Sequence, residues 1–147
     1  MKKLITILII LSSSIYSIYS QNKTIKGRII DEHLEIIPGV SIIITDTVKI
    51  GYADLNGFFE LDVPISVNKI MFYFPGIETA IINLSDNCDK VDLVMMYSVH
   101  YDFISLKKAD RLRMKRFKKL PETHKKAYQM GLFTTDKTCY VQEFTTH

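Results

Sequence analysis

Short runs of alternating apolar and polar residues fill most of residues 24–96. In one of them, Phe59, Leu61 and Val63 are separated by single acidic residues. A period of two places alternate side chains on opposite faces of a β-strand. Such runs predict seven strands, at residues 24–31, 39–45, 48–53, 58–63, 68–74, 78–84 and 90–96. Because no helical period lies between them, we expect a mainly β protein, a seven-stranded antiparallel β-sandwich.

Turn-forming residues separate the predicted strands. Pro38 fixes its own φ and Gly39 tolerates a positive φ, so this pair predicts a turn. Asp54, Asn56 and Gly57 predict a tight hairpin turn between the third and fourth strands. Gly57 suits a left-handed backbone position in that turn.

The pattern changes to a helical period after residue 101. Apolar residues then recur every three or four positions, at Phe103, Leu106, Ala109, Leu112, Phe117 and Leu120. Asp102 is a candidate N-cap, and Pro121 ends this helix and can begin a second one that runs to Met130. Residues 138–144 can return as a short strand. We expect the extension, residues 98–147, to lay this apolar stripe on a sheet, with apolar burial as its main attachment.

The first twenty residues have the pattern of a secretory signal peptide. A basic start, Lys2-Lys3, is followed by an apolar run and by Ser20, which predicts cleavage before Gln21. An uncleaved anchor is the alternative, because Ile18 is large for its position before the cut. Nothing later in the chain is apolar for long enough to span a bilayer. We therefore expect an exported protein, located in the periplasm, at the outer membrane or outside the cell.

Charge divides the chain into two regions. Residues 21–97 carry six Lys/Arg and eleven Asp/Glu, whereas residues 98–147 carry eleven Lys/Arg and five Asp/Glu. Eight of the basic residues lie between 107 and 119. A run of this kind can bind nucleic acid or anionic lipid. In an exported protein, a solvated helix face or docking on the acidic sandwich is the better interpretation, and we expect no nucleic-acid partner.

The chain has two cysteines, Cys88 and Cys139. Export would place them where disulfides persist, and a bridge would join the extension to the sandwich. The loop-entropy relation assigns such a bridge about 4 kcal/mol. Two free thiols are the alternative, since the sequence does not supply the distance between them.

Five motifs in order resemble the carboxypeptidase regulatory-like domain. They are Gly-Arg-Ile-Ile-Asp at 27–31, Pro-Gly-Val-Ser-Ile at 38–42, Thr47 with Gly51, the segment 53–61, and the segment 72–79, which contains the turn glycine Gly76. The chain departs from the family at Ala53, where the family has Thr, and at Ile77, where it has an aromatic residue. The resemblance covers residues 23–97. It implies a transthyretin-like sandwich that is not catalytic and that also occurs alone in exported bacterial proteins.

The sequence offers little support for catalysis or a cofactor. None of the four histidines has the Glu three residues on that a zinc pair of the metallocarboxypeptidase type requires. Asp54 and Asn56 resemble part of a calcium loop, but Tyr52 and Val63 stand where it needs acidic residues. Phosphate-binding and nucleophile motifs are absent. We therefore expect a protein that is not an enzyme and that needs no cofactor or metal.

Three aromatic residues lie on the strand face opposite the predicted core: Tyr52, Phe58 and Tyr73. Exposed aromatics on a sandwich can stack on sugars or contact a protein. The favoured interpretation is that the C-terminal helix covers them and that they form a second core layer.

These observations leave three hypotheses about function. The first, which we favour, is a non-enzymatic module of the bacterial cell envelope that binds a protein or glycan through its sandwich face or loops. The second is a small hydrolase with a site assembled from scattered His, Asp and Cys, which a pocket with convergent His and carboxylate would favour. The third is a binder of anionic lipid or nucleic acid, which a continuous exposed basic face on residues 107–119 would favour.

Overall fold

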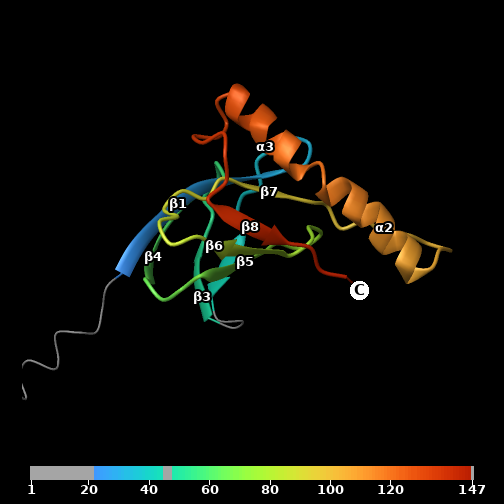
Figure 1. The fold of residues 1–147 in the computed structure, drawn as a ribbon, viewed down its shortest axis with the longest axis horizontal. Helices are drawn as coiled ribbons and strands as arrows, with labels where there is room; N and C mark the ends of the chain where they lie inside the picture. The colour runs from blue at the N-terminus through green and yellow to red at the C-terminus, as the bar shows by residue number, and fades with distance from the viewer. Residues whose placement is uncertain (1–21, 45–47, 147) are drawn as a thin grey trace, which may run out of the picture.

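The computed structural model describes residues 22–44 and 48–146, so the predicted signal peptide, Thr47 and His147 lie outside the described residues. Figure 1 shows a body of β-strands with two helices along one side of it. The strands are β1 (Asn22–Asp31), β2 (Ser41–Ile44), β3 (Val48–Tyr52), β4 (Phe58–Pro64), β5 (Lys69–Tyr73), β6 (Ala80–Leu84), β7 (Leu93–Met95) and β8 (Tyr140–Glu143). The helices are α2 (Leu106–Phe117) and α3 (Leu120–Gln129).

The strands form two sheets. One has three strands in the order β4-β1-β7, and the other has five in the order β3-β2-β5-β6-β8. The prediction of a mainly β fold is confirmed, but the described residues form eight strands instead of seven. The eighth, β8, comes from the C-terminal extension. The antiparallel prediction is wrong for one pair, because β7 lies parallel to β1, with Ile29 opposite Leu93.

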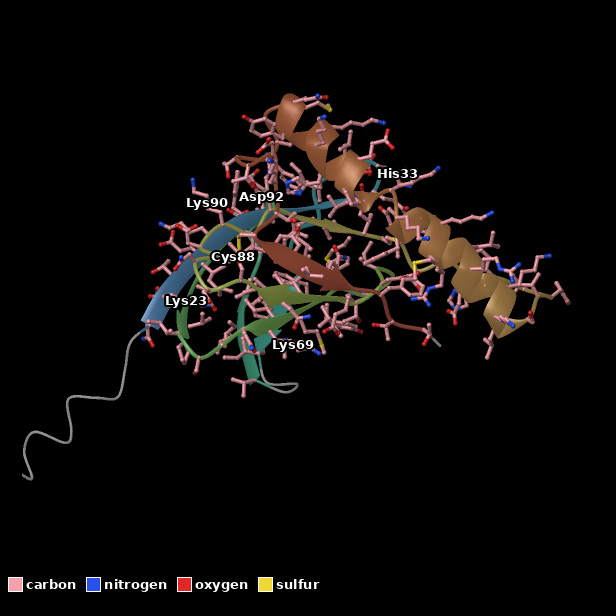
Figure 2. All side chains as sticks on the ribbon, viewed as in Figure 1. Lys23, His33, Lys69, Cys88, Lys90 and Asp92 are labelled. Carbon is pink, nitrogen blue, oxygen red and sulfur yellow. A yellow bond between two sulfur atoms is a disulfide. The ribbon has the colours of Figure 1, made fainter. Side chains whose placement is uncertain are left out.

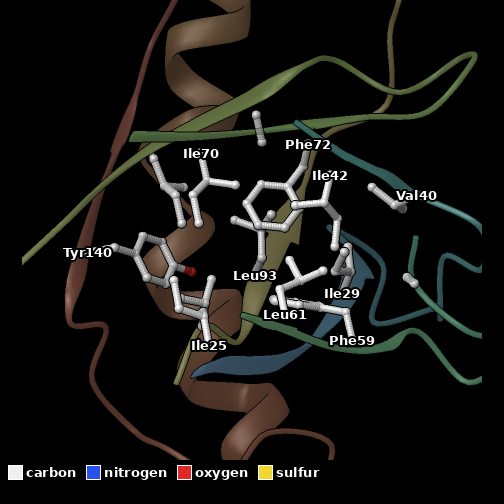
Figure 3. Close-up of a cluster of buried hydrophobic side chains, with 14 of the residues drawn as sticks. Ile25, Ile29, Val40, Ile42, Phe59, Leu61, Ile70, Phe72, Leu93 and Tyr140 are labelled. Carbon is white, nitrogen blue, oxygen red and sulfur yellow. The ribbon is translucent and has the colours of Figure 1, made fainter. Parts of the chain in front are cut away.

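The main core lies between the two sheets (Figure 3). In β4, Phe59, Leu61 and Val63 are buried and the residues between them are exposed, as the alternation predicts. The ring of Phe59 meets that of Phe72 on β5, with centroids 5.6 Å apart and ring planes at 60°. Each buried side chain of this kind stabilises the fold by about 1.5–3 kcal/mol, so this layer supplies most of the attraction between the sheets.

The turn at residues 54–57 forms, but it does not close a hairpin. The Asp54 carboxylate accepts the backbone N–H groups of Asn56 and Phe58, both at 2.8 Å. Gly57 has a φ of +75°, and a Cβ there would lie 2.6 Å from the carbonyl oxygen of Ile29. However, β3 pairs with β2 whereas β4 pairs with β1, so the turn carries the chain from one sheet to the other. The predicted hairpin is therefore wrong, because turn chemistry does not specify which sheet receives the next strand.

Two further predicted turns contain glycines in the left-handed region. Gly39, which follows Pro38, has a φ of +71°, and Gly76 has a φ of +80°. The N–H of Gly39 donates to the carbonyl of Ala53 at 3.0 Å, which ties the start of β2 to the end of β3.

The helical extension begins later than the sequence predicts. Ser105, instead of Asp102, is the residue that precedes the first helical turn. The reason is visible at Phe103, whose φ of +61° is incompatible with a right-handed helix. Pro121 lies in the first turn of α3, the position where its missing N–H costs nothing. Neither helix is long and apolar enough to cross a membrane, and no other helix of the described residues is.

A second, smaller core attaches α3 to the three-stranded sheet. Its buried members are Ile30 of β1, Val94 and Met96 at β7, and Leu120, Ala127 and Phe133 of the extension. Ile30 and Val94 lie on the outer side of their sheet, which explains why β7 is buried on both faces. The extension therefore forms a third layer over part of the sandwich.

Candidate functional site

The two cysteines join the extension to the sandwich at the start of β8. Cys88 and Cys139 form a disulfide, with Cα atoms 5.2 Å apart and a sequence separation of 51 (Figure 2). Next to it, Ser85 donates its N–H (3.0 Å) and its hydroxyl (2.7 Å) to the carbonyl of Cys139. The bridge and these bonds hold the first residue of β8 against the end of β6.

A buried carboxylate, Asp92, holds the segment that leads from α3 to β8 (Figure 2). One of its oxygens accepts the backbone N–H of Thr134 at 2.7 Å, the Thr134 hydroxyl at 3.0 Å and the N–H of Thr135 at 3.3 Å. The other accepts the N–H of Arg28 at 3.2 Å. The four bonds compensate for the burial of this group, so Asp92 is a structural acceptor.

Two side chains of β8 close the open edge of β7. The hydroxyl of Tyr140 donates to the carbonyl of Asp92 at 2.6 Å, and the amide of Gln142 donates to the carbonyl of Val94 at 3.4 Å. Figure 3 shows the Tyr140 ring reaching from β8 into the core. Burial raises the pKa of Tyr140, so its hydroxyl keeps the donated proton. As a result the carbonyl of Val94 in β7 and that of Asp92 just before it have partners, whereas β8 becomes the last strand of the five-stranded sheet.

A groove of about 720 Å³ separates β8 from the helices. Its apolar walls come from Val94, Phe117, Leu120, Pro121, Tyr140 and Val141. Lys118 and Lys137 line it as exposed residues, together with Asp136. Because Tyr140, Val141 and Gln142 are consecutive and alternate in direction, all three can line one groove only if the backbone edge of β8 faces it.

His124 of α3 lies in the wall of this groove and is buried. Its Nε2 is 3.0 Å from the carbonyl oxygen of Thr135, and its ring packs on Phe133 with centroids 4.8 Å apart. Its Nδ1 has no hydrogen-bond partner in the described part of the chain. Asp136 lines the same groove, but no hydrogen bond or ion pair joins it to His124. The groove therefore contains a histidine and a carboxylate, but no bond between described residues couples them.

The three predicted binding aromatics are exposed, by 59% for Tyr52, 46% for Phe58 and 48% for Tyr73. The expectation that the C-terminal helix covers them is wrong, because α3 packs on Ile30 and Val94 instead. Tyr52 and Tyr73 lie on either side of Ser41 in the five-stranded sheet and share one face. Phe58 lies on the other sheet, with the guanidinium of Arg28 4.5 Å from its ring centroid.

Tyr52 and Phe58 nevertheless line one open hollow of about 570 Å³, together with Lys26, Glu60 and Lys90. Tyr73 is not part of it. The structure thus brings Tyr52 and Phe58 together at the hollow, whereas Tyr73 lies outside it on the same sheet face as Tyr52.

Helix α2 is attached to the sandwich by two arginines, the buried Arg113 and the partly buried Arg116. Arg113 donates two bonds of 2.8 Å to the carboxylate of Glu78, one of 2.8 Å to Asp110 and one of 3.0 Å to the carbonyl of Thr145. Arg116 pairs with Glu32 and donates to the carbonyl of Tyr97 at 2.9 Å. Most contacts of this helix with the sandwich are therefore ion pairs and hydrogen bonds, and the expectation that apolar burial dominates its attachment energetically stays a prediction.

The apolar residues at the start of this helix point into solvent. Leu106 is 67% exposed, so the expectation that it lies on a sheet is wrong, and Phe103 just before the helix is fully exposed. Leu112 is partly buried. Only Ala109 and Arg113 of α2 are buried, and Phe117 is partly buried at its end. The reason is that α2 extends beyond the sandwich at its N-terminal end (Figure 1), where no sheet lies beneath it.

The remaining basic residues of 107–119 form an exposed stripe: Lys107, Lys108, Arg111, Lys115, Lys118 and Lys119. None of them makes an ion pair with a described residue. We call this set the cationic face. It exists because Arg113 and Arg116 are used internally and so determine which side of the helix faces solvent.

The three histidines that the structure describes lie apart from one another. His33 lies beside Tyr97 with ring centroids 5.8 Å apart, His100 is exposed, and His124 is the buried residue described above. Across residues 22–44 and 48–146, no three His, Cys, Asp or Glu side chains are placed to hold a metal ion together.

Comparison with known proteins does not identify the chain. No model of a known protein family matches it, and no curated protein does. The resemblance to the carboxypeptidase regulatory-like domain therefore stays a hypothesis.

Proposed function

We propose that this protein is a non-enzymatic binding module exported to the bacterial cell envelope. The observation that carries the proposal is the junction of extension and sandwich, where the Cys88–Cys139 disulfide and β8 create a groove. Disulfides persist in oxidising compartments outside the cytoplasm, which agrees with the signal-peptide pattern of residues 1–20. A module that resembles the carboxypeptidase regulatory-like domain would bind a protein or glycan partner through such a groove and its loops.

Export and oxidation are tested together. We expect the periplasmic or secreted protein to begin at Gln21, and non-reducing peptide mapping to yield one linked pair of peptides with Cys88 and Cys139. The variant Cys139→Ser should lose about 4 kcal/mol of unfolding free energy, according to the loop-entropy relation for a closure of this length. A cytoplasmic chain that begins at Met1 with two alkylatable thiols would contradict the proposal.

Binding is tested with the tagged, processed protein in its own cell envelope. Photocrosslinkers placed at exposed Lys137, beside the groove, and at exposed Tyr52, in the aromatic hollow, should report which surface meets the partner. A crosslinker at exposed Val48, on β3 at the edge of the five-stranded sheet opposite β8 and outside both linings, is the control. Equal yields at all three positions would mean that none of them marks a specific site.

The cationic face favours a second candidate function, contact with an anionic membrane surface. Six exposed cations, four on α2 and two in the residues that follow it, attract anionic headgroups by about 1 kcal/mol each near the surface. We expect the protein to sediment with phosphatidylglycerol vesicles but not with phosphatidylcholine vesicles, and 0.5 M salt to release it. Replacing Arg111, Lys115 and Lys118 by Gln should abolish sedimentation.

The matched control for that test replaces three lysines elsewhere, Lys26, Lys90 and Lys125, by Gln, so the net charge changes equally. If this control binds as weakly as the α2 variant, net charge alone explains the attraction and the cationic face has no special role.

A further inference from the structure

We infer that the open edge of β8 is a docking site for an extended, acidic polypeptide segment, which adds to the five-stranded sheet as a sixth strand. This inference rests on the proposed binding function and assigns it a site and a kind of partner. The edge strand, the groove beside it and the charges around the groove each support a different part of it.

The backbone of β8 supplies the first argument. The N–H of Ser85 donates to the carbonyl of Cys139, and antiparallel pairing alternates from there along the strand. Val141 and Glu143 therefore point their backbone groups toward β6. Those of Tyr140 and Gln142 point away from it, and no bond to them occurs among the described residues. The backbone N–H and C=O groups of Tyr140 and Gln142 are therefore available to pair with an added strand.

The other sheet edges are protected, which makes β8 the exception. Natural proteins protect an edge with a bulge, a lysine, a proline or a cover. The outer strand β3 contains Lys49, and its pairing with β2 is irregular between Ile42 and Ile43. Strand β4 ends in Pro64, and the carbonyls along β7 accept bonds from side chains of β8. Strand β8, Tyr-Val-Gln-Glu, contains no lysine, proline or bulge, and its only protective features are its short length and Glu143.

The groove supplies room for an added strand. At about 720 Å³ it has the volume of a small-molecule or peptide site, and its far wall is formed by helix residues Phe117, Leu120 and Pro121. Addition of an extended peptide to a sheet edge is an established recognition mode, in which backbone bonds give affinity and pockets for alternate side chains give specificity. Here alternate side chains of the added strand would face the apolar wall.

The charges around the groove select the partner. Lys118 and Lys137 line it and are exposed, against one carboxylate, Asp136. The extension as a whole has eleven Lys/Arg against five Asp/Glu. In a segment with alternating apolar and acidic residues, the apolar side chains would pack against the helices and the acidic side chains would lie near Lys118 and Lys137. Strand β8 has four residues, so the complementary segment is about as short, near 13 Å at 3.3 Å per residue.

The experiment uses the oxidised protein from Gln21 to His147 and a defined probe. The probe is an acetylated and amidated octapeptide of alternating Val and Glu, and the comparison peptide has Lys in place of Glu. We expect the Val–Glu peptide to shift the amide signals of residues 140–142 and 118–124, and to slow hydrogen exchange at Tyr140 and Gln142. The Lys peptide should bind at least tenfold more weakly. An unshifted spectrum, or shifts confined to other surfaces, would overturn the inference.

One pair of variants separates strand addition from ordinary contact. Gln142→Pro removes an edge-facing N–H but none that pairs with β6, and we expect it to weaken peptide binding at least tenfold. Gln142→Ala removes the same side-chain bond to Val94 but keeps the N–H, and we expect it to bind at least tenfold more tightly than Gln142→Pro. Equal binding by both variants would overturn strand addition. If Gln142→Pro fails to fold, slowed exchange at Tyr140 and Gln142 in the wild type decides the question alone.

Failure of this inference is distinguishable from failure of the proposed function. If photocrosslinking in the envelope captures a partner from the aromatic hollow while the peptide leaves residues 140–142 unchanged, the binding function stands and the groove inference falls. If the protein proves to be cytoplasmic and reduced, the proposed function falls irrespective of what the peptide does.

Discussion

The two helices of the extension are attached to the same sandwich by different forces. Helix α3 and the residues after it bury Leu120, Ala127 and Phe133 against β1 and β7. Helix α2 buries Ala109 and one arginine, and its main contacts are ion pairs with Glu78 and Glu32. Apolar contact depends on area and hardly on direction, whereas a two-bonded guanidinium–carboxylate pair requires one orientation.

This difference explains the placement of charge on the surface. Arg113 and Arg116 lie one turn apart on the inner side of α2, so their two carboxylate partners fix the rotation of the helix about its axis. The cationic face must then point outward. Buried ion pairs add little net stability when weighed against their desolvation, but breaking one is costly. We therefore regard α3 as the anchor of the extension and α2 as the oriented element.

The largest effect should come from the apolar anchor. Phe133→Ala should lower the free energy of unfolding by about 3–5 kcal/mol, because it removes a ring that is 3% exposed and leaves a cavity. Guanidinium denaturation midpoints measure this. Met130→Ala, at a residue 64% exposed at the end of α3, is the control and should change stability by less than about 0.5 kcal/mol. Similar losses for both would show that α3 does not anchor the extension.

The next effect concerns the orienting arginine. Arg113→Met should cost about 3 kcal/mol, because it leaves the carboxylate of Glu78 buried without its guanidinium. Hydrogen exchange should quicken in residues 106–117 and stay slow in β5. Adding Glu78→Gln should recover part of the loss. A double variant less stable than the sum of the two single changes would contradict this ion-pair account.

The strands could be predicted from the sequence because alternation reports directly which side chains face a core. The pairing of the strands could not be predicted in the same way. The turn at residues 54–57 shows why, because the same turn residues can close a hairpin or carry the chain from one sheet to the other. The predicted packing of helix α2 was wrong for a related reason. Its apolar period is real, but the burial of Arg113 depends on Glu78, a residue 35 positions away. Local patterns do not contain such partners.

The candidate site was only partly within reach of the sequence. The two cysteines pointed to the junction, and residues 138–144 were expected as a strand, yet the groove arises only when β8 joins β6 as an edge. The sequence did contain one indication of a strand at this place, because the polar Tyr140 and Gln142 alternate with the apolar Val141. The three aromatics show the opposite error. We expected the C-terminal helix to cover Tyr52, Phe58 and Tyr73, but all three are exposed.

A smaller effect is expected from the second ion pair, and it depends on pH. Burial alone would raise the pKa of Glu32, but bonds from Arg116 and from the N–H of Tyr97 outweigh it, and the pKa lies below its ordinary value of 4.5. The folded state therefore favours the ionised carboxylate. This contribution is complete above the unfolded pKa and is lost as the pH falls through the folded one.

We therefore expect denaturation midpoints to fall as the pH drops below about 4.5, and Glu32→Gln to flatten this part of the curve. At neutral pH the variant should cost about 1–2 kcal/mol, since Arg116 loses a partly shielded partner. Other carboxylates titrate in the same range, so the difference between the two proteins is the quantity to read. Parallel curves would show that Glu32 is not coupled to folding.

The smallest effect should come from the tip of α2, and it tests the comparison most directly. Leu106 and Leu120 belong to one apolar stripe in the sequence, but the first is 67% exposed and the second 6%. Leu120→Ala should cost about 2–5 kcal/mol and Leu106→Ala less than about 0.5 kcal/mol, by the same denaturant measurement. Equal costs would mean that Leu106 is packed in solution and that apolar burial holds α2 as well. Unequal costs leave an apolar tip beside the cationic face with no role in stability, which is the arrangement expected of a surface kept for contact with another molecule.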